Sequence, residues 1–524
     1  MGIPSYFSHI IKNHRNIIQN VNSVSSVQNL YLDSNSIIYD SVYKLQNLYQ
    51  NDQQFEALVI KEVQNTLFNY ISVLKPKRVF IAFDGVAPIA KLQQQRERRF
   101  KSQFFNELYE STNIKNNSKW NTVAITPGTQ FMEKLHNEFQ DFDKKIIHKF
   151  SFVKEAKFSS WKEAGEGEHK IFEFIRNVIH QNEVTLVYGL DADLIMLSIC
   201  HLQYCNKLYL YRETPEFIKS IDSSLKPNEQ YILHIGYLGD QIYEILNSKN
   251  NKPNATKYDI LQDYIFLCFL LGNDFMPHFP ALNIRTNGIY HLTECYNQHM
   301  NKTIIKNNTI IWQTFREFVN ILKEYEPIWI IEEYDGLVKK EKQFIKATND
   351  EEKKNKIMNI PANNRNIEHF INPHELGWET RYYDKCFHIT YETSRIKQIC
   401  HNFLEALEWT YTYYTNGCKC WNWKYNYNYA PLLKDLYDYI PFFETEFINN
   451  GSKIPLQPHI QLAYVLPPDS LDYITHPKLN DLKLYLETIS SSYNIEWTFC
   501  KYLWEAHVHM PEIKIDQLKL IMAH

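Results

Sequence analysis

The sequence has no apolar segment long enough to cross a membrane. Its longest apolar run, YIFLCFLL at 264–271, falls well short of the roughly 20 residues that span a bilayer and favours a buried helix instead. The opening residues, MGIPSYFSHIIKNH, contain no apolar core of signal-peptide length. Tyr6 also stands where a myristoylation signal requires serine or threonine. We therefore expect no membrane partner and no secretion.

A disulfide framework and an excess of positive charge are missing as well. The nine cysteines are scattered and odd in number, which predicts a reduced, intracellular protein. CKC at 418–420 has no second Cys/His pair at zinc-finger spacing. The formal net charge of −4 excludes a general polyanion binder, so any contact with nucleic acid must come from local basic clusters. Aromatic residues, in contrast, make up 15% of the chain and are available for core packing and stacking.

At 524 residues, the chain is expected to form more than one domain. Short apolar runs alternate with longer helical patterns in its first part, and the runs NLYLD (29–33), RVFIAFD (78–84) and VTLVYGLD (184–191) each end in an aspartate. This alternation predicts an α/β domain with a mostly parallel central sheet flanked by helices. Ligands of such sheets bind beyond the carboxyl ends of the strands, where these aspartates would lie.

Three regions are predicted in all. The α/β domain occupies residues 1–295. Residues 296–365 become polar and rich in lysine, as in LVKKEKQFIKATNDEEKKNKIMN (337–359), and predict a variable helical linker of mixed charge. Residues 366–524 predict a second compact region that is mainly helical and rich in aromatics.

Carboxylates are the first candidates for chemistry. Taken singly, each is explained equally well as a helix cap or as an acid near a helix N-terminus. Several that converge at one sheet need cations to offset their repulsion, and Mg²⁺ prefers oxygen ligands and substrate phosphates. Two such ions about 4 Å apart stabilise both the attacking and the leaving oxygen of a phosphodiester displacement. The spacing therefore favours a metal-dependent phosphoryl hydrolase built on seven acids: Asp33, Asp84, Glu166, Glu168, Asp191, Asp193 and Asp274.

A basic helical stripe follows one of these acids. In FDGVAPIAKLQQQRERRF (83–100), Lys91, Gln95, Arg98 and Arg99 stand at i, i+4, i+7 and i+8, the spacing of one helix face. A solvated basic helix is the plain interpretation. Because the helix begins just after Asp84, however, its basic face and its positive N-terminal end can both point toward the acids. Helix N-termini and arginine forks both bind phosphate.

Taken in order, the motifs resemble those of the XRN family of 5′→3′ exoribonucleases over nearly the whole chain. The family's first conserved region is resembled by MGIPSYF, LYLDSNSIIYD, FIAFDGVAPIAKLQQQRERRFKS, ITPGTQFM, GEGEHKIFEFIR, YGLDADLIML and LGNDFMPHFP. Its second region is resembled by LGWETRYYDKCF, CWNWKYNYNYAP, QLAYVLPP and WEAHVHMPEI. We expect the catalytic core with both conserved regions and without the long C-terminal extension of the large cytoplasmic members.

The resemblance implies a nuclease core related to flap endonucleases (a PIN/FEN-like core), in which the seven acids bind divalent metal, Mg²⁺ or alternatively Mn²⁺, as two ions. It also implies that Lys91, Gln95, Arg98 and Arg99 hold the 5′-monophosphate of the RNA. Tyr39 stands where the family usually has histidine, and the resemblance implies that its ring stacks on the terminal base together with Trp421 or Trp423, between which the sequence does not decide. The second region is implied to close the active-site channel.

The function expected from the resemblance is processive 5′→3′ hydrolysis of single-stranded RNA that carries a 5′-monophosphate, with release of nucleoside 5′-monophosphates. Such activity belongs to RNA degradation after decapping or endonucleolytic cleavage. We expect a cytoplasmic monomer, with the decapping machinery as a candidate partner. A structure-specific flap or DNA nuclease of the same superfamily is an alternative, as is a non-catalytic protein that binds RNA 5′ ends. The aromatic second region argues against the former, and the intact set of acids argues against the latter.

Overall fold

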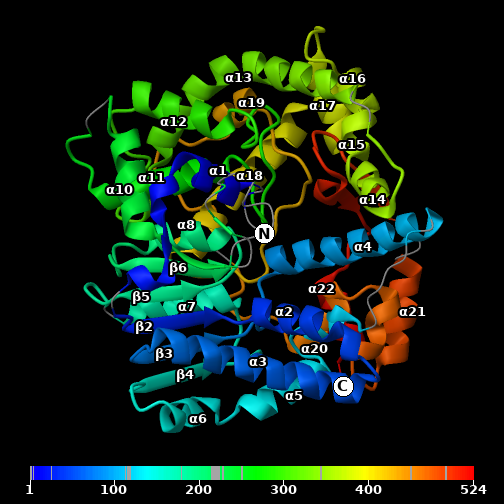
Figure 1. The fold of residues 1–524 in the computed structure, drawn as a ribbon. Helices are drawn as coiled ribbons and strands as arrows, with labels where there is room; N and C mark the ends of the chain where they lie inside the picture. The colour runs from blue at the N-terminus through cyan, green and yellow to red at the C-terminus, as the bar shows by residue number, and fades with distance from the viewer. Residues whose placement is uncertain are drawn as a thin grey trace.

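The computed structural model describes residues 3, 5–24, 26–112, 114, 120–178, 180–213, 223, 225–226, 229–249, 252–342, 345–448, 451–489 and 493–523. Its centre is a seven-stranded sheet in the order β1-β7-β6-β5-β2-β3-β4 (Figure 1). The strands are β1 (Ile18–Asn20), β2 (Asn29–Asp33), β3 (Arg78–Ala82), β4 (Glu155–Ser159), β5 (Thr185–Tyr188), β6 (Leu208–Glu213) and β7 (Gln230–His234).

Five neighbouring strands, β6, β5, β2, β3 and β4, run parallel, while β7 and β1 continue one edge in antiparallel pairing. Within the parallel group the chain starts at β2, proceeds outward through β3 and β4, and then returns to β5 on the other side of β2. The strand order therefore reverses between β2 and β5, and such a reversal opens a crevice beyond the carboxyl ends of the strands. The predicted α/β class with a mostly parallel sheet is confirmed.

Both faces of the sheet are covered, as parallel sheets require. Along β2, Leu30 and Leu32 pack into one core while Tyr31 packs into the other, because successive side chains of a strand point to opposite faces. Helices α3 (Asp52–Leu74), α5 (Gln130–Phe139) and α6 (Phe142–Lys149) cover the leucine face. Helices α7 (Gly167–Asn177), α8 (Asp193–Cys200) and α10 (Ile235–Leu246) cover the tyrosine face.

The remaining elements surround this sheet domain. They are α1 (Tyr6–Asn13), α2 (Asn35–Leu45), α4 (Ile89–Ser111), α11 (Lys257–Phe269), α12 (Gly288–His299), α13 (Trp312–Glu341), α14 (Asp350–Met358), α15 (Ile360–Asn363), α16 (Asn366–Ile371), α17 (Trp378–Phe387), α18 (Thr393–Thr415), α19 (Leu433–Tyr439), α20 (Pro458–Val465), α21 (Leu479–Ile489) and α22 (Ile515–Ile521), with the strand pairs β8 (Ile305–Lys306) with β9 (Thr309–Ile310) and β10 (Asn494–Glu496) with β11 (His507–His509).

The core on the tyrosine face continues into the C-terminal half of the chain. Residues of α11, α13 and α18 belong to the same apolar cluster as those of α7 and α8. Within the segment predicted to be a polar linker, Trp312, Phe315 and Phe318 of α13 are buried in that cluster, whereas in α14 Ile357 is the one buried residue. The boundaries proposed at residues 295 and 365 stay a prediction.

Helix α4 leaves the sheet and is clamped by the C-terminal segment. Ile89 and Leu92, in its first turn, share an apolar cluster with Ile460 and Leu462 of α20, and β11 also packs on α4. In Figure 1, α4 runs across the molecule with α2 and α20–α22 on one side and α14–α17 on the other. Within the described ranges, no helix is both long and apolar enough to cross a membrane.

Candidate functional site

The predicted acids gather at the carboxyl ends of the parallel strands. Asp33 ends β2, Asp84 follows β3 by two residues, and Glu166 and Glu168 flank the start of α7. Gly167 allows this approach, since a Cβ added there would lie 2.6 Å from Asp33 Oδ1. Its N–H donates to Asp84 Oδ1 over 2.7 Å. The N-terminus of α7 is thus drawn onto the acids of β2 and β3.

A single cavity of about 1160 Å³ joins most of the predicted residues. Its lining includes five of the acids and the entire basic stripe of α4, together with Tyr39: Asp33, Asp84, Glu166, Glu168, Asp191, Lys91, Gln95, Arg98 and Arg99. The other two acids do not line the cavity but interact with residues that do: Asp274 pairs with Lys91, and Asp193 interacts electrostatically with Lys91 and Asp191. The structure therefore brings the acids and the basic stripe to one place.

Lys91 connects the two groups. It is buried, and its Nζ lies 2.6 Å from Glu166 Oε2 and 2.9 Å from Asp274 Oδ2. Burial alone would raise the pKa of Asp274, but the Lys91 ammonium holds that pKa well below its ordinary value. The first turn of α4 is in this way fixed to α7 and to the segment that follows α11.

Four of the acids, Asp33, Asp84, Glu168 and Asp193, are destabilised as anions. Loss of solvent, with the neighbouring charges of Asp84 and Asp191, raises the pKa of Asp33 well above its ordinary value. Burial raises the pKa of Asp84 to about 6 and that of Asp193 to about 7. For Glu168, burial and the charge of Glu166 also raise the pKa well above the usual range. A set of crowded carboxylates with this behaviour calls for added positive charge.

Three carboxylate oxygens of these acids lack the partner that burial normally requires. Asp33 Oδ1, Glu168 Oε2 and Asp193 Oδ1 are buried and have no hydrogen-bond partner within the described part of the chain. Buried carboxylate oxygens are normally satisfied by a donor or an ion, and carboxylate oxygens are the preferred ligands of Mg²⁺ and similar hard cations. The residues present therefore fit a divalent metal.

Several contributors to this site escaped the sequence analysis. Tyr413 of α18 donates its O–H to Glu166 Oε1 over 2.8 Å, and its ring stacks on His169 with centroids 3.7 Å apart. His169 adds an imidazole whose nitrogen lies within 4.8 Å of carboxylate oxygens of Glu166 and Glu168. Asn35 Nδ2 donates to Asp84 Oδ2 over 2.6 Å. Asn35 and His169 stand beside predicted acids in the motifs, whereas nothing in the sequence pointed to Tyr413.

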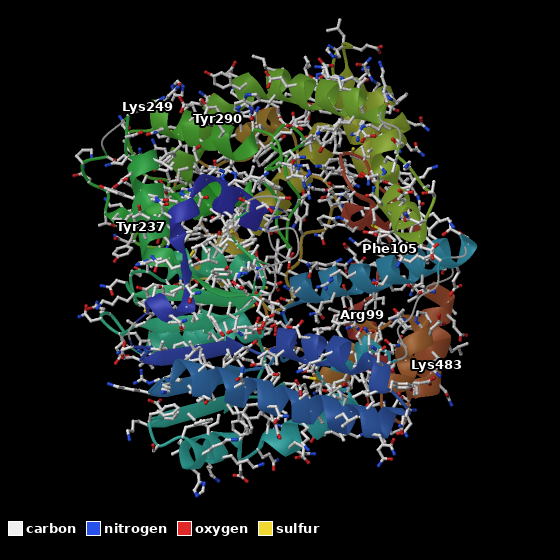
Figure 2. The ribbon with its side chains drawn as sticks, in the orientation of Figure 1. Arg99, Phe105, Tyr237, Lys249, Tyr290 and Lys483 are labelled. Atoms are coloured by element: carbon white, nitrogen blue, oxygen red, sulfur yellow. The ribbon has the colours of Figure 1, made fainter. Side chains whose placement is uncertain are left out.

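The residues of the basic stripe line the cavity, whereas the neighbouring basic residues Arg96 and Lys101 contact the C-terminal segment. Arg99 donates from Nη2 to Thr126 Oγ1 over 2.7 Å, and its buried Nη1 has no partner among the residues described. Burial lowers the pKa of Arg99 to about 10. Figure 2 shows Arg99 between α4 and α2. Arg96 and Lys101 instead donate to the Pro511 and Ala506 carbonyls and so hold the C-terminal segment against α4.

The three predicted stacking residues are placed differently. Tyr39 on α2 lines the cavity and is 38% exposed. Trp423 is buried and stacks on Trp409 with centroids 5.1 Å apart. Trp421 is half-buried, and its carbonyl accepts the N–H of Ile89 over 2.9 Å, at the first residue of α4.

Comparison with known proteins decides the family. A protein-family model described as XRN 5′-3′ exonuclease N-terminus matches residues 1–214 of the sequence. A second family model, described as Xrn1 helical domain, matches residues 256–369 and 331–518. The chain belongs to the XRN family. Both conserved regions expected from the sequence are therefore confirmed, and nucleases of the XRN family are metal-dependent.

Curated relatives of the XRN chain carry exoribonuclease names. It is 28% identical to 5′-3′ exoribonuclease 1 of Homo sapiens over 100% of this chain and 34% of the relative. It is 32% identical to 5′-3′ exoribonuclease 1 of Saccharomyces cerevisiae over 62% of this chain and 23% of the relative. For 5′-3′ exoribonuclease 2 of Kluyveromyces lactis the identity is 30%, over 58% of this chain and 36% of the relative. The chain thus spans about a third or less of these proteins.

If the acids of this XRN chain bind a divalent metal, for which Mg²⁺ is the probe, the stabilisation that the metal gives should depend on pH. A carboxyl whose pKa is higher in the folded than in the unfolded chain binds more protons when folded, so its contribution to stability decreases as pH rises through that interval. With the pKa raised to about 6 for Asp84 and about 7 for Asp193, the interval runs from about pH 4 to about pH 7. Mg²⁺ should offset this loss, because protons and metal compete for the same oxygens.

The measurement is the difference in Tm between Mg²⁺ and EDTA, taken across this pH range. The difference should be small near pH 5 and increase toward about pH 7.5. Asp193→Asn should reduce the increase. Asp40→Asn removes an acid whose pKa is also raised to about 6 but which does not line the cavity, and it should leave the profile unchanged. A pH-independent difference, or identical profiles for the two variants, would contradict the metal assignment.

Proposed function

We propose that the chain is a processive 5′→3′ exoribonuclease that hydrolyses single-stranded RNA bearing a 5′-monophosphate and releases nucleoside 5′-monophosphates. The supporting observation is that one cavity is lined both by five of the crowded acids and by the basic stripe of α4. The exoribonuclease names of the relatives agree with this proposal. Cleavage close to an RNA end requires a cation-binding group, here the acids, next to a phosphate-binding group, here the basic stripe of α4.

The basic stripe of α4 supports the direction of cleavage. A terminal phosphate carries a charge near −2, whereas an internal diester carries about −1, so several converging donors favour the end. We assign this group to Gln95, Arg98 and Arg99, which line the cavity, with Arg99 Nη1 as a donor that has no partner among the described residues. A capped or triphosphorylated end should fit badly in the same place. Each hydrolysis leaves a new 5′-phosphate, which supports processive action.

Lys91 receives a modified role in this proposal. Its ammonium lies between Glu166 and Asp274. Lys91 therefore belongs to the group of acids at least as much as to the phosphate-binding residues proposed on α4. We assign it to the boundary between them, where it offsets carboxylate charge and faces the phosphodiester that follows the terminal phosphate. Because Lys91 lies in the first turn of α4, the proposal also has the positive N-terminal end of this helix face the RNA.

The seven acids are proposed to hold two Mg²⁺ ions, with Mn²⁺ as an alternative. Bound metal would supply stabilisation of the attacking and leaving oxygens. The residues of the chain do the rest. The unpartnered oxygens of Asp33, Glu168 and Asp193 provide ligands, and Tyr413 fixes the orientation of Glu166 through its hydrogen bond.

Aromatic rings are proposed to hold the terminal base. Tyr39 is exposed in the cavity, and base stacking on a ring contributes about 1–3 kcal/mol per base. Trp421 is the better of the two proposed partners because Trp423 is buried against Trp409. The proposal also includes a cytoplasmic monomer that receives its substrates from decapping, which generates the required 5′-monophosphate.

The decisive experiment incubates purified protein and Mg²⁺ with matched RNAs that carry a 5′-monophosphate, a 5′-hydroxyl or a cap, beside a branched DNA flap. We expect only the monophosphorylated RNA to be degraded, and only to mononucleotides. Glu166→Gln and Asp191→Asn should each lose several kcal/mol of transition-state stabilisation, roughly 1000-fold in rate, while RNA binding persists. Cleavage at the flap junction, or RNA retention without products in the unmodified chain, would refute the proposal.

The phosphate-binding residues proposed on α4 can be tested separately. Arg98→Ala combined with Arg99→Ala should remove the preference for a 5′-monophosphate over a 5′-hydroxyl end, measured as the ratio of kcat/KM values. Lys483→Ala combined with Lys519→Ala is the matched control, because it removes the same charge from two lysines outside the cavity, which pair with Asp472 and Asp516. An unchanged ratio in the arginine variant would place the phosphate site elsewhere.

Tyr413 is expected to act as a positioning residue. A hydrogen bond to a charged group contributes about 1.5–3 kcal/mol, so Tyr413→Phe should lower kcat by roughly 10- to 100-fold with little change in KM. Tyr411→Phe on the same helix is the control, since the buried Tyr411 hydroxyl has no hydrogen-bond partner within the described structure. Equal kcat values for the two variants would show that the contact with Glu166 does not matter for hydrolysis.

A further inference from the structure

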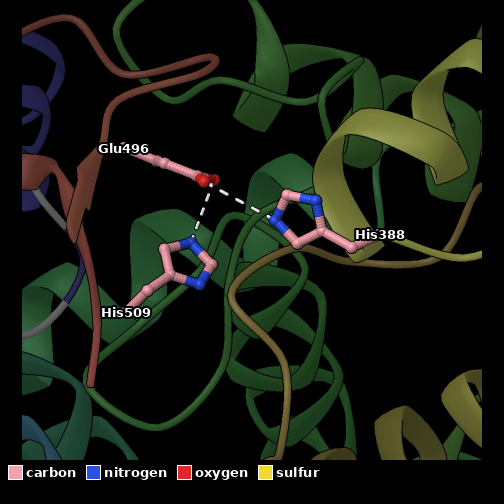
Figure 3. A group of neighbouring side chains, drawn as sticks. All are labelled: His388, Glu496 and His509. Carbon is pink, nitrogen blue, oxygen red and sulfur yellow. Dashed lines mark ion pairs between the residues drawn. The ribbon is translucent and has the colours of Figure 1, made fainter. Parts of the chain in front are cut away.

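A second group of metal-ligand side chains lies outside the cavity. His388, Glu496 and His509 converge from three segments of the C-terminal half, as Figure 3 shows. His388 Nε2 lies 3.5 Å from Glu496 Oε1, and His509 Nε2 lies 2.9 Å from Glu496 Oε2. All three ligand atoms lie within 4.8 Å of one another. The group shares no residue with the acid site.

The fold holds the three side chains in place. In the antiparallel pair β10–β11, Asn494 is opposite His509 and Glu496 is opposite His507, so Glu496 and His509 project from the same face as diagonal neighbours. His388 follows α17 in the left-handed conformation, with φ of 55°, which histidine adopts more readily than most residues. A hairpin and a helix end thus present one carboxylate between two imidazoles.

The three ligand atoms lie close enough together to share one transition-metal ion. Zinc bonds to histidine nitrogen and carboxylate oxygen are about 2.0–2.2 Å, so donor atoms at tetrahedral angles are separated by roughly 3.3 Å. The two imidazole nitrogens approach the two oxygens of the one carboxylate, at 3.5 Å for His388 Nε2 to Oε1 and 2.9 Å for His509 Nε2 to Oε2, so both lie in the range of such donor separations. Two imidazoles with one carboxylate also form a known zinc ligand set that leaves a fourth position open. The Asn428 amide nitrogen lies 3.1 Å from the same His509 Nε2, and metal would replace it as the partner of that nitrogen.

Ion pairing alone explains the arrangement less well. Exposed ion pairs contribute about 0–1 kcal/mol, and His388 is 59% exposed in its side chain. His374 and His369, also on the surface, each pair with one acid, Asp335 and Glu341. The group around Glu496 differs because two imidazole Nε2 atoms face the same carboxylate.

We propose that His388, Glu496 and His509 bind one divalent transition metal of the Zn²⁺ class and that this metal fastens the β10–β11 hairpin to the end of α17. The hairpin packs on α4 through β11, and Lys101 of α4 donates to the Ala506 carbonyl just before β11. The metal would therefore stabilise the contact between β11 and α4. This inference does not depend on the proposed hydrolysis of RNA.

The test uses the full chain, freed of metal with a chelator and then titrated with Zn²⁺ by calorimetry. Because Zn²⁺ can also enter the acid site, the titration is done in a Glu166→Gln, Glu168→Gln background. We expect one bound equivalent, which His388→Ala and Glu496→Gln each lose and the control His374→Ala retains. Co²⁺ in place of Zn²⁺ should give the intense visible absorption of a tetrahedral site, again lost with His388→Ala.

Thermal unfolding gives a second readout that does not require activity. Zn²⁺ should raise the Tm of the Glu166→Gln, Glu168→Gln background and of its His374→Ala variant, and should leave the Tm of the His388→Ala variant unchanged. His388 lies on the surface after a helix end, so its replacement should not prevent folding. No bound equivalent in the background chain, or equal binding in His388→Ala and His374→Ala, would overturn the proposal.

Discussion

Repulsion between crowded carboxylates is the constraint on which the rest of the structure depends. The carboxyl ends of β2, β3 and β5 bring acids together with those of α7 and α8, and burial makes their negative charges costly. Part of the cost is offset within the chain, where Lys91 pairs with Glu166 and Asp274. The buried oxygens that the described chain leaves unpartnered are the part that an added cation would satisfy.

The two halves of the chain share this site. Tyr413 reaches Glu166 from α18, and Asp274 follows α11, while the helix that carries Lys91 begins next to the Trp421 carbonyl and packs on α20. A truncation after the sheet would therefore remove a hydrogen-bond donor from the acids and the support from α4. In this XRN fold, C-terminal elements therefore supply contacts to the charged groups at the sheet edge. The apolar core that is continuous between the sheet domain and these elements keeps the two parts in fixed positions.

The sheet and most residues of the candidate site could be predicted from the sequence because the relevant sequence patterns are local. Aspartates at strand ends, such as Asp33 and Asp84, indicated which edge of the sheet carries the site. The 3.6-residue period of a helix separated Arg99, which lines the cavity, from Arg96, which is buried against the C-terminal segment. Periodicity gives a face of a helix but not its neighbour, so it did not indicate that Lys91 would pair with two acids. Tyr413 is 247 residues from Glu166, and no local pattern encodes a contact at that separation.

Helix α4 also sets a distance. Lys91 and Arg99 are eight residues apart on one helix, and at 1.5 Å per residue their Cα atoms are separated by about 12 Å. The helix is fixed at one end by the ion pairs of Lys91 and farther along by Arg96 and Lys101, which bind the C-terminal segment. In the proposed reaction, a terminal phosphate held by Arg98 and Arg99 is therefore kept at a constant distance from the acids. The rigidity of α4, rather than recognition of any base, would then determine which phosphodiester reaches the metals and why each product is one nucleotide long.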